Sequence, residues 1–224
     1  MRPYYEHAGI QIFHGDCREI LPALPKVDLV LTDPPYGINA ARTRNSQKWG
    51  WGDFDVTGWD IVRAGREAIE LSVSCGTNAI VWGGNYFSDY LPASSKWLIW
   101  DKGQSGFSLA DAELAWCSFG GAVRRILLPR AIALRDGKKH PTQKPVAVIA
   151  WAINQAPDPS HTILDPFMGS GTTLVAAKQL GRSAIGIEIE EKYCEIAAKR
   201  LSQEVLPLVA EAREIKQVAL GLGE

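Results

Sequence analysis

The chain has 224 residues, of which 46% are hydrophobic and 22% are charged, a composition typical of one soluble α/β domain. Its formal net charge of −1 excludes a polycation that binds nucleic acid through bulk charge. The sequence has no apolar run of membrane-spanning length and no signal-peptide core, and its four cysteines and four histidines show no metal-ligand spacing. We therefore expect a cytoplasmic protein without a membrane partner or a metal site.

Short strand-like runs alternate with helical patterns, which is typical of a mostly parallel sheet covered by helices on both faces. In chain order, we expect strands at residues 11–14, 27–32, 78–82, 96–100, 112–119, 162–165 and 183–189. We expect helices at residues 60–74, 145–154, 172–180 and 190–203. Since no repeat or linker divides the chain, residues 1–224 are expected to form a single domain.

The sequence Asp33-Pro34-Pro35-Tyr36 directly follows the second expected strand. An exocyclic base amine is a poor nucleophile because its lone pair is delocalised into the ring. The Asp33 carboxylate and the Pro34 carbonyl could accept its two N–H bonds and favour a pyramidal nitrogen. The prolines fix φ and add no competing donor, and Tyr36 provides a flat face for an extruded base. An ordinary diproline turn is the alternative.

Basic residues gather in two segments. One holds Arg42, Arg44 and Lys48, and the other, residues 124–139, has six basic residues against one acid. If the amine held by Asp33 belongs to a base in duplex DNA, that base must be flipped out of the helix, and such segments could hold the opened DNA. The DNA contacts expected on this basis are Arg42, Arg44, Lys48, Arg124, Arg125 and Arg130. Two solvated loops are the alternative.

A glycine-rich turn follows the strand that ends at Asp165 and precedes the helix that begins at Thr172. Gly169 and Gly171 permit a sharp turn and leave room for a ligand, as in nucleotide sites at the carboxyl edge of a sheet. The turn lacks the Gly-Lys-Ser/Thr ending of a phosphate loop, so ATP is not expected. The next strand ends near Glu188, an acid that can accept hydrogen bonds from ribose hydroxyls.

The two motifs lie about 130 residues apart, and they resemble those of the amino-methylating DNA methyltransferases in the beta-group order, with the catalytic motif first. The resemblance runs from about residue 14 to about residue 201. It implies a Rossmann-like fold of the S-adenosylmethionine-dependent methyltransferases, with a mostly parallel seven-stranded sheet in circularly permuted order. It also implies that S-adenosylmethionine is held by Asp165, Phe167, Gly169, Ser170, Gly171, Thr172 and Glu188.

The resemblance implies three further cofactor contacts. Asp16, after the first strand, would meet the adenine amine of the cofactor, and Thr142 and Lys144 would contact its carboxylate. Lys144 precedes the helix expected at 145–154, and a helix N-terminus itself favours anions. A lysine there is electrostatically sensible only if an anion lies there too.

The function implied is methylation of the exocyclic amine of adenine in double-stranded DNA, by a site-specific enzyme of the restriction-modification type. Adenine is favoured over cytosine because the motif begins with Asp, where cytosine-modifying relatives more often have Ser. A cytosine-amine DNA methyltransferase, an RNA or protein-amide methyltransferase and a catalytically silent nucleic-acid-binding protein are the alternatives. The target-recognition insertion, expected at about residues 120–139, is short, and a homodimer could enlarge the footprint on DNA.

Overall fold

The computed structural model describes residues 1–38, 62–105, 110–129, 143–157 and 161–202. Its strands are β1 (Tyr5–His7), β2 (Ile10–His14), β3 (Val27–Thr32), β4 (Gly76–Trp82), β5 (Trp97–Asp101), β6 (Ala112–Cys117), β7 (Arg124–Leu127), β8 (Thr162–Asp165) and β9 (Ser183–Glu188). Its α-helices are α1 (Cys17–Ile20), α2 (Arg66–Ser74), α4 (Val146–Ile153), α5 (Thr172–Gln179) and α6 (Glu191–Ser202). Two 3₁₀ turns, η1 (Leu21–Ala23) and η4 (Gly84–Phe87), complete the elements used below.

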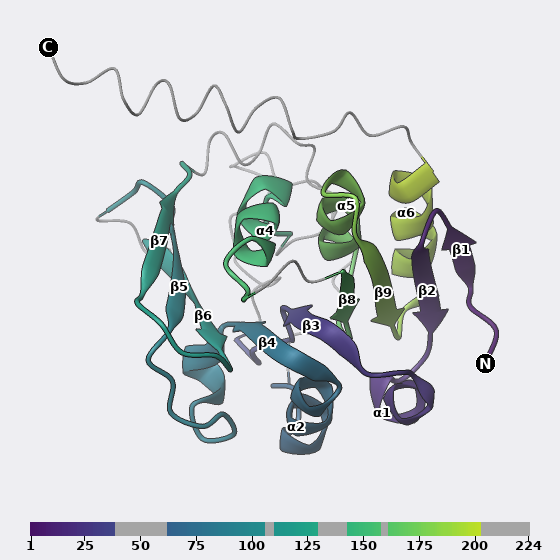
Figure 1. Ribbon diagram of the computed structural model, residues 1–224, viewed down its shortest axis with the longest axis horizontal. Helices are drawn as coiled ribbons and strands as arrows, with labels where there is room; N and C mark the ends of the chain where they lie inside the picture. Colours follow the sequence, from purple (N-terminus) through teal and green to yellow (C-terminus); the bar gives the residue numbers. More distant parts are fainter. Residues whose placement is uncertain (39–61, 106–109, 130–142, 158–160, 203–224) are drawn as a thin grey trace, which may run out of the picture.

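In this described part of the chain, nine strands form one sheet in the order β1-β2-β9-β8-β3-β4-β6-β5-β7 (Figure 1). The five strands from β2 to β4 in that order are mutually parallel, and β7 is parallel to β5. β6 is antiparallel to both of its neighbours, and β1 is antiparallel to β2. The late strands β8 and β9 therefore lie between the early strands β2 and β3, which confirms the permuted, mostly parallel sheet.

All seven expected strands are present, with ends within two residues of those predicted, but the expected count of seven is too low. The two additional strands are β1 and β7, which have three and four residues and are largely exposed. Each lies at one edge of the sheet. A short edge strand buries too few side chains to leave an alternating apolar pattern in the sequence.

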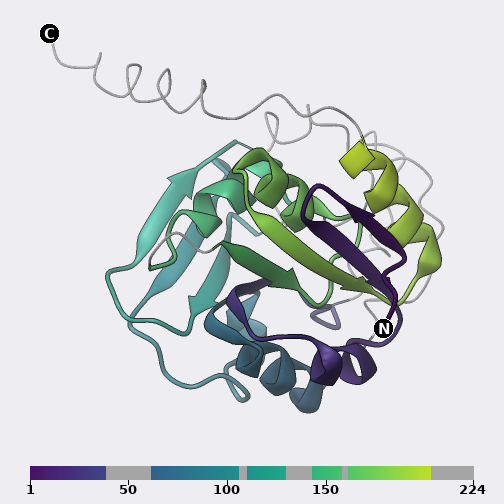
Figure 2. The ribbon, with the colours of Figure 1, turned by 45° about the vertical axis from the view of Figure 1, so that its right-hand side comes forward.

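Helices cover both faces of the sheet: α4, α5 and α6 lie on one side, and α1 and α2 lie on the other (Figures 1 and 2). Strand β3 shows how the two cores arise. Leu29 and Leu31 pack into the core under α4 and α5, whereas Val30 packs into the core over α1 and α2. Because both faces of β3 are covered, residues 29–31 form a continuous apolar run.

One expected helix is shorter than predicted. Residues 60–74 have helical spacing, but α2 begins only at Arg66, and residues 60 and 61 lie outside the described ranges. Ala64 donates a backbone hydrogen bond to Pro35 (2.9 Å), and Arg63 forms a β-bridge with Tyr36. The start of this segment therefore pairs with the loop after β3 and cannot also be helical.

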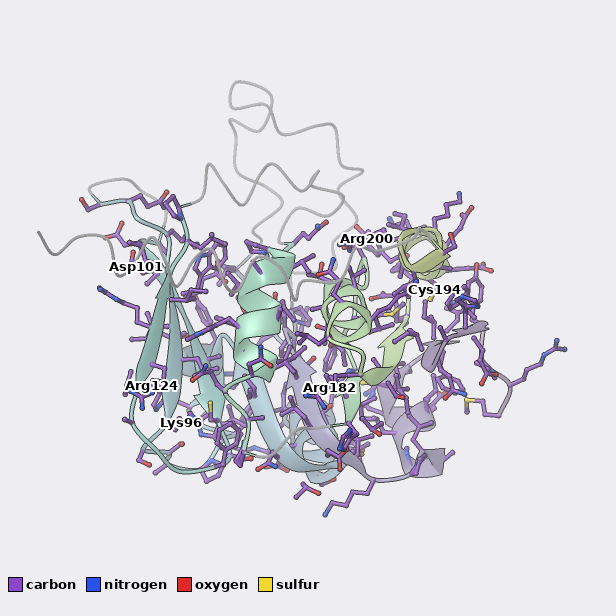
Figure 3. The ribbon with its side chains drawn as sticks, turned by 45° about the horizontal axis from the view of Figure 1, so that its top comes forward. Lys96, Asp101, Arg124, Arg182, Cys194 and Arg200 are labelled. Atoms are coloured by element: carbon purple, nitrogen blue, oxygen red, sulfur yellow. The ribbon has the colours of Figure 1, made fainter. Side chains whose placement is uncertain are left out.

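The strand directions place several chain segments at one edge of the sheet. Since β2, β9, β8, β3 and β4 are parallel, the loops that follow them emerge together. Strand β6 is antiparallel to β4, so β6 begins at this same edge, and β5 ends there. Figure 3 labels Asp101 and Lys96 at the two opposite ends of β5, and the strand pairing places the Asp101 end at the edge where the parallel strands end.

Candidate active site

The loop Asp33-Pro34-Pro35-Tyr36 leaves the end of β3 in a fixed conformation. Its anchors are the Pro35 carbonyl, bonded by Ala64, and the β-bridge between Tyr36 and Arg63. Among the residues that the structure describes, none donates a hydrogen bond to the Pro34 carbonyl. One of the two acceptors expected for an amine is thus available.

Asp33 lies in a cluster of charges in which the two lysines are buried and the two carboxylates are partly buried. Its Oδ2 atom is 2.5 Å from Lys144 Nζ, and its Oδ1 atom accepts a hydrogen bond from the Tyr36 hydroxyl. Lys144 Nζ is also 3.1 Å from Glu113 Oε2, and the other carboxylate oxygen of Glu113 is 2.8 Å from Lys102 Nζ. We call Asp33, Lys144, Glu113 and Lys102 the four-charge cluster.

Burial and ion pairing act against each other in this cluster. Burial raises the pKa of Asp33, and the Lys144 ammonium partly offsets that rise. Burial also acts to raise the pKa of Glu113, but Lys144 and Lys102 together outweigh it and lower that pKa to about 2. For Lys144, burial favours the neutral form, yet Asp33 and Glu113 raise its pKa. Lys144 and Glu113 are therefore charged at neutral pH.

The Tyr36 ring is held between the sheet and a second tyrosine. It stacks on the ring of Tyr86 in η4, with centroids 4.8 Å apart and planes 14° from parallel. A Cβ at Gly83 would overlap the Tyr36 ring, so glycine is required there for close approach. Tyr86 is 38% exposed. The ring expected to stack on a base therefore has an exposed aromatic neighbour that sequence reasoning did not single out.

A cavity of about 380 Å³ opens beside the same edge of the sheet, and its size falls in the range of small-molecule sites. It is lined in part by the segment after β2, by the start of α2, by the loop after β8 and by the end of β9. The residues most relevant here are Gly15, Asp16, Gly65, Phe167 and Glu188. The structure thus brings three of the predicted cofactor residues, Asp16, Phe167 and Glu188, to one cavity.

Glu188 ties the glycine-rich turn to the end of β9. Its Oε2 accepts a hydrogen bond from the backbone N–H of Gly169 (2.9 Å), and its Oε1 accepts one from the N–H of Glu190 (2.9 Å). Burial raises the pKa of Glu188. The carboxylate therefore lines the cavity while it is held in place by backbone donors.

Asp165 points into the protein instead of lining the cavity. It is buried, and it accepts hydrogen bonds from the Thr32 hydroxyl (2.8 Å) and from the Phe167 N–H (3.1 Å). Burial raises its pKa to about 6. Asp165 thus fastens the beginning of the turn to β3, next to the loop that carries Asp33.

Arg200 of α6 holds the other end of the turn, and sequence reasoning missed it. Its Nη1 atom donates to the Ser170 carbonyl (2.5 Å) and to the Thr172 hydroxyl (3.2 Å). Figure 3 shows Arg200 beside α5 and α6. The Ser170 hydroxyl also lies 3.3 Å from Gln143 Oε1. Since these contacts join segments far apart in the chain, no local pattern reveals them.

The two glycines of the turn have different surroundings. Both have positive φ, +50° at Gly169 and +78° at Gly171. A Cβ at Gly169 would have no neighbour within 4 Å, whereas a Cβ at Gly171 would lie 2.7 Å from the Cβ of Ala197. Gly171 is therefore needed for packing of the turn on α6, and Gly169 borders open space.

Asp16 has a structural role beside its place in the cavity. It is the N-cap of α1 and accepts a hydrogen bond from the Arg18 N–H (2.9 Å). It also forms an ion pair with the Arg18 side chain (2.5 Å), whose hydrogen bonds lower the pKa of Asp16.

The remaining predicted residues divide into three groups. Lys144, expected at a cofactor carboxylate, contacts Asp33 and Glu113. Arg124 and Arg125 lie exposed on edge strand β7, with Arg125 Nη1 3.3 Å from Asp101 Oδ2. The other predicted residues lie outside the described ranges: Thr142, Arg42, Arg44, Lys48 and Arg130. In the described part of the chain, no helix could cross a membrane and no acidic, His or Cys cluster could hold a metal ion.

Comparison with known proteins agrees with this geometry. A family model described as DNA methylase matches residues 118–199. The Type II methyltransferase M2.DpnII of Streptococcus pneumoniae is 53% identical, over 91% of this chain and 93% of its own. The crystal structure of M1.HpyAVI in complex with S-adenosylmethionine is 25% identical with a TM-score of 0.60, over 87% of this chain and 100% of that chain.

A fourth similarity concerns the fold alone. The PvuII DNA methyltransferase, described as cytosine-N4-specific, is 15% identical with a TM-score of 0.61, over 97% of this chain and 93% of that chain. Together with the cavity and the loop after β3, these similarities identify the chain as a member of the DNA methylase family, the S-adenosylmethionine-dependent DNA methyltransferases.

Proposed function

We propose that this DNA methyltransferase methylates the exocyclic amine of adenine in double-stranded DNA at a specific site, in the cytoplasm of a bacterium. The observation that carries the proposal is the fixed loop after β3, which carries the Asp33 carboxylate and the Pro34 carbonyl, an acceptor without a hydrogen-bond donor among the described residues. Strand β8, which leads into the glycine-rich turn, is the immediate neighbour of β3. The amine acceptors and the cofactor turn thus adjoin.

The residues around the cavity fit S-adenosylmethionine. The Glu188 carboxylate would accept ribose hydroxyls, Asp16 would meet the adenine amine, and the open space at Gly169 would admit the cofactor next to the backbone. When bound, S-adenosylmethionine supplies a methyl group from its sulfonium. By contrast, Asp165 and Gly171 would support the site through contacts with Thr32 and Ala197.

The chain's own residues would act on the target amine. Asp33 and the Pro34 carbonyl would accept its two N–H bonds and favour a pyramidal nitrogen whose lone pair is free to attack. As this nitrogen becomes positively charged, its bond to the Asp33 carboxylate strengthens. The proton can leave after methyl transfer, so no general base is needed. Tyr36 would support the flipped base through its ring.

Adenine is proposed over cytosine because the motif begins with Asp33, where cytosine-modifying relatives more often have Ser. Arg124 and Arg125 are proposed to contact DNA phosphates from the edge of the sheet, together with Arg42, Arg44, Lys48 and Arg130. A homodimer would extend this surface. The chain's similarity to a Type II methyltransferase favours a role in restriction-modification.

Methylation of unmethylated plasmid DNA tests the proposal. The DNA is incubated with the protein and S-adenosylmethionine, digested to nucleosides and analysed by mass spectrometry for N6-methyladenine and N4-methylcytosine. We expect N6-methyladenine, and we expect Asp33→Ala to reduce the single-turnover rate by about 10²–10³-fold with cofactor binding retained. N4-methylcytosine alone would contradict the choice of base. A folded, cofactor-bound Asp33→Ala with near wild-type rate would contradict the catalytic site.

A further inference from the structure

The Lys144 ammonium lies between two carboxylates and is almost completely enclosed. The residue is 5% exposed, and its Nζ atom is 2.5 Å from Asp33 Oδ2 and 3.1 Å from Glu113 Oε2. Lys102 Nζ pairs with the other oxygen of Glu113. The four-charge cluster thus has two cations and two anions and is neutral as a whole.

Both carboxylate oxygens of Asp33 already have a donor in this arrangement. Lys144 occupies Oδ2, and the Tyr36 hydroxyl occupies Oδ1. The target amine needs one of these oxygens, and it becomes positively charged during methyl transfer. An ammonium that stayed in contact with the same oxygen would compete with the amine's N–H and repel its developing charge.

Glu113 offers Lys144 a second anion at the distance of a direct ion pair. Because a buried ammonium without a counter-charge is strongly destabilised, Lys144 can leave Asp33 only if another anion receives it. Glu113 lies at the start of β6, an antiparallel strand, so its carboxylate reaches the edge where β3 ends. Nothing else in the proposed mechanism uses this carboxylate.

We propose that Glu113 is a positioning residue for methyl transfer: it receives the Lys144 ammonium when the target amine takes the place of Lys144 at Asp33. This inference rests on the role proposed above for Asp33. No proton moves in the exchange, since Lys144 remains an ammonium and only its ion-pair partner changes. Lys102 keeps Glu113 in place throughout through its own ion pair.

Loss of the Glu113 charge should slow methyl transfer but leave cofactor binding unchanged. In Glu113→Gln, Lys144 has Asp33 as its one remaining anion in the cluster, and the cluster carries a net positive charge beside the reacting nitrogen. Both effects oppose entry of the amine and methyl transfer. Cofactor binding should be spared, because neither Glu113 nor Lys144 lines the cavity beside Glu188.

A double-mutant cycle tests whether Glu113 acts through Lys144. Single-turnover methylation is measured at saturating DNA and S-adenosylmethionine for the wild type, Glu113→Gln, Lys144→Met and the double variant. We expect Glu113→Gln to slow methylation by about tenfold or more in the wild-type background and by less than about twofold in the Lys144→Met background. The affinity for S-adenosylmethionine should stay within about twofold of the wild type in all four proteins.

Two further variants support the comparison. Glu113→Asp keeps the charge but withdraws it by one methylene, so the same cycle can be run with it if the glutamine variant does not fold. Glu113→Asp should slow methylation less than Glu113→Gln does. As with the glutamine variant, the effect should be seen in the wild-type background and not in the Lys144→Met background. Lys96→Met is the matched lysine control: Lys96 donates to the Gln155 carbonyl (2.8 Å) at the opposite end of β5 (Figure 3), and its loss should leave the rate within about twofold.

Three results would overturn the inference. One is a folded Glu113→Gln that methylates at nearly the wild-type rate. Another is a double variant whose methylation rate is reduced by the product of the two single-variant reductions, which would show that Glu113 acts independently of Lys144. The third is a loss of cofactor affinity of about tenfold in Lys144→Met, which would indicate that Lys144 contacts the cofactor carboxylate, as first expected. Failure of the proposed function itself would be seen separately, as near wild-type methylation by Asp33→Ala.

Discussion

Three glycines with left-handed backbone conformations allow cofactor binding by the glycine-rich turn to be tested separately from the packing of that turn. Gly169 and Gly171 lie in the turn with φ of +50° and +78°, and Gly181 lies just beyond α5 with φ of +67°. A Cβ at Gly169 or at Gly181 would have no neighbour within 4 Å. A Cβ at Gly171 would lie 2.7 Å from the Cβ and 3.4 Å from the Cα of Ala197.

These surroundings give different expected losses of stability on substitution by alanine. The left-handed conformation costs an L-residue about 1–2 kcal/mol, and all three variants should lose that amount. Gly171→Ala adds overpacking against α6, about 1–3 kcal/mol more. Its total of about 2–5 kcal/mol is a large part of the roughly 5–15 kcal/mol that stabilises an ordinary domain. Equilibrium denaturation should therefore give Gly171→Ala a lower free energy of unfolding than Gly169→Ala and Gly181→Ala.

The order of these variants in affinity for S-adenosylmethionine should differ from their order in stability. A methyl group at Gly169 enters the space that we assign to S-adenosylmethionine, so Gly169→Ala should bind it about tenfold more weakly by calorimetry, a loss of about 1.4 kcal/mol. Gly181→Ala has the same backbone strain outside the cavity and should bind normally. Equal affinity in these two variants would refute the placement of the cofactor. A Gly171→Ala protein as stable as Gly181→Ala would refute the packing argument.

Three other substitutions test the remaining parts of the site. Tyr36→Phe removes the hydroxyl that donates to Asp33 but keeps the aromatic ring, so its single-turnover rate should fall only a few-fold, whereas Tyr36→Ala should be at least about tenfold slower again. Equal rates would argue against base stacking. Glu188→Ala removes the carboxylate that bonds Gly169 and lines the cavity, and calorimetry should show S-adenosylmethionine binding weakened by about 1–3 kcal/mol. Unchanged affinity would exclude Glu188 from the cofactor site. Joint replacement of Arg124 and Arg125 by Ala should weaken DNA binding and reduce its salt dependence by up to about two charges, without affecting the cofactor. An unchanged salt slope would identify these arginines as a solvated surface.

The central strands could be predicted from the sequence because they are covered on both faces. β3 and β8 appear in the chain as short apolar runs that end directly at Asp33 and Asp165, and their bounds match those expected. The loops that follow parallel strands share one edge of the sheet, so local order along the chain was enough to bring these motifs together. The edge strands β1 and β7, by contrast, bury too little surface to leave such a pattern.

Residues that reach the site from other directions could not be predicted in this way. Glu113 begins a strand, and the beginning of a strand lies at the site only if that strand is antiparallel to its neighbours, as β6 is. Arg200 reaches the glycine-rich turn because α6 packs beside α5, and Tyr86 reaches Tyr36 from η4. Each of these contacts depends on how distant segments pair, which periodicity along the chain does not encode.

The surroundings of Lys144 could be predicted from the local sequence only in part. A lysine just before a helix needs an anion nearby, because the helix N-terminus carries partial positive charge and burial penalises an unpaired ammonium. That requirement follows from the sequence alone, and the structure meets it with two carboxylates. Which carboxylates they are depends on β3 ending, and β6 beginning, at one edge of the sheet. The helix rule thus predicts that an anion is present, but the strand directions decide that the carboxylates beside Lys144 are those of Asp33 and Glu113.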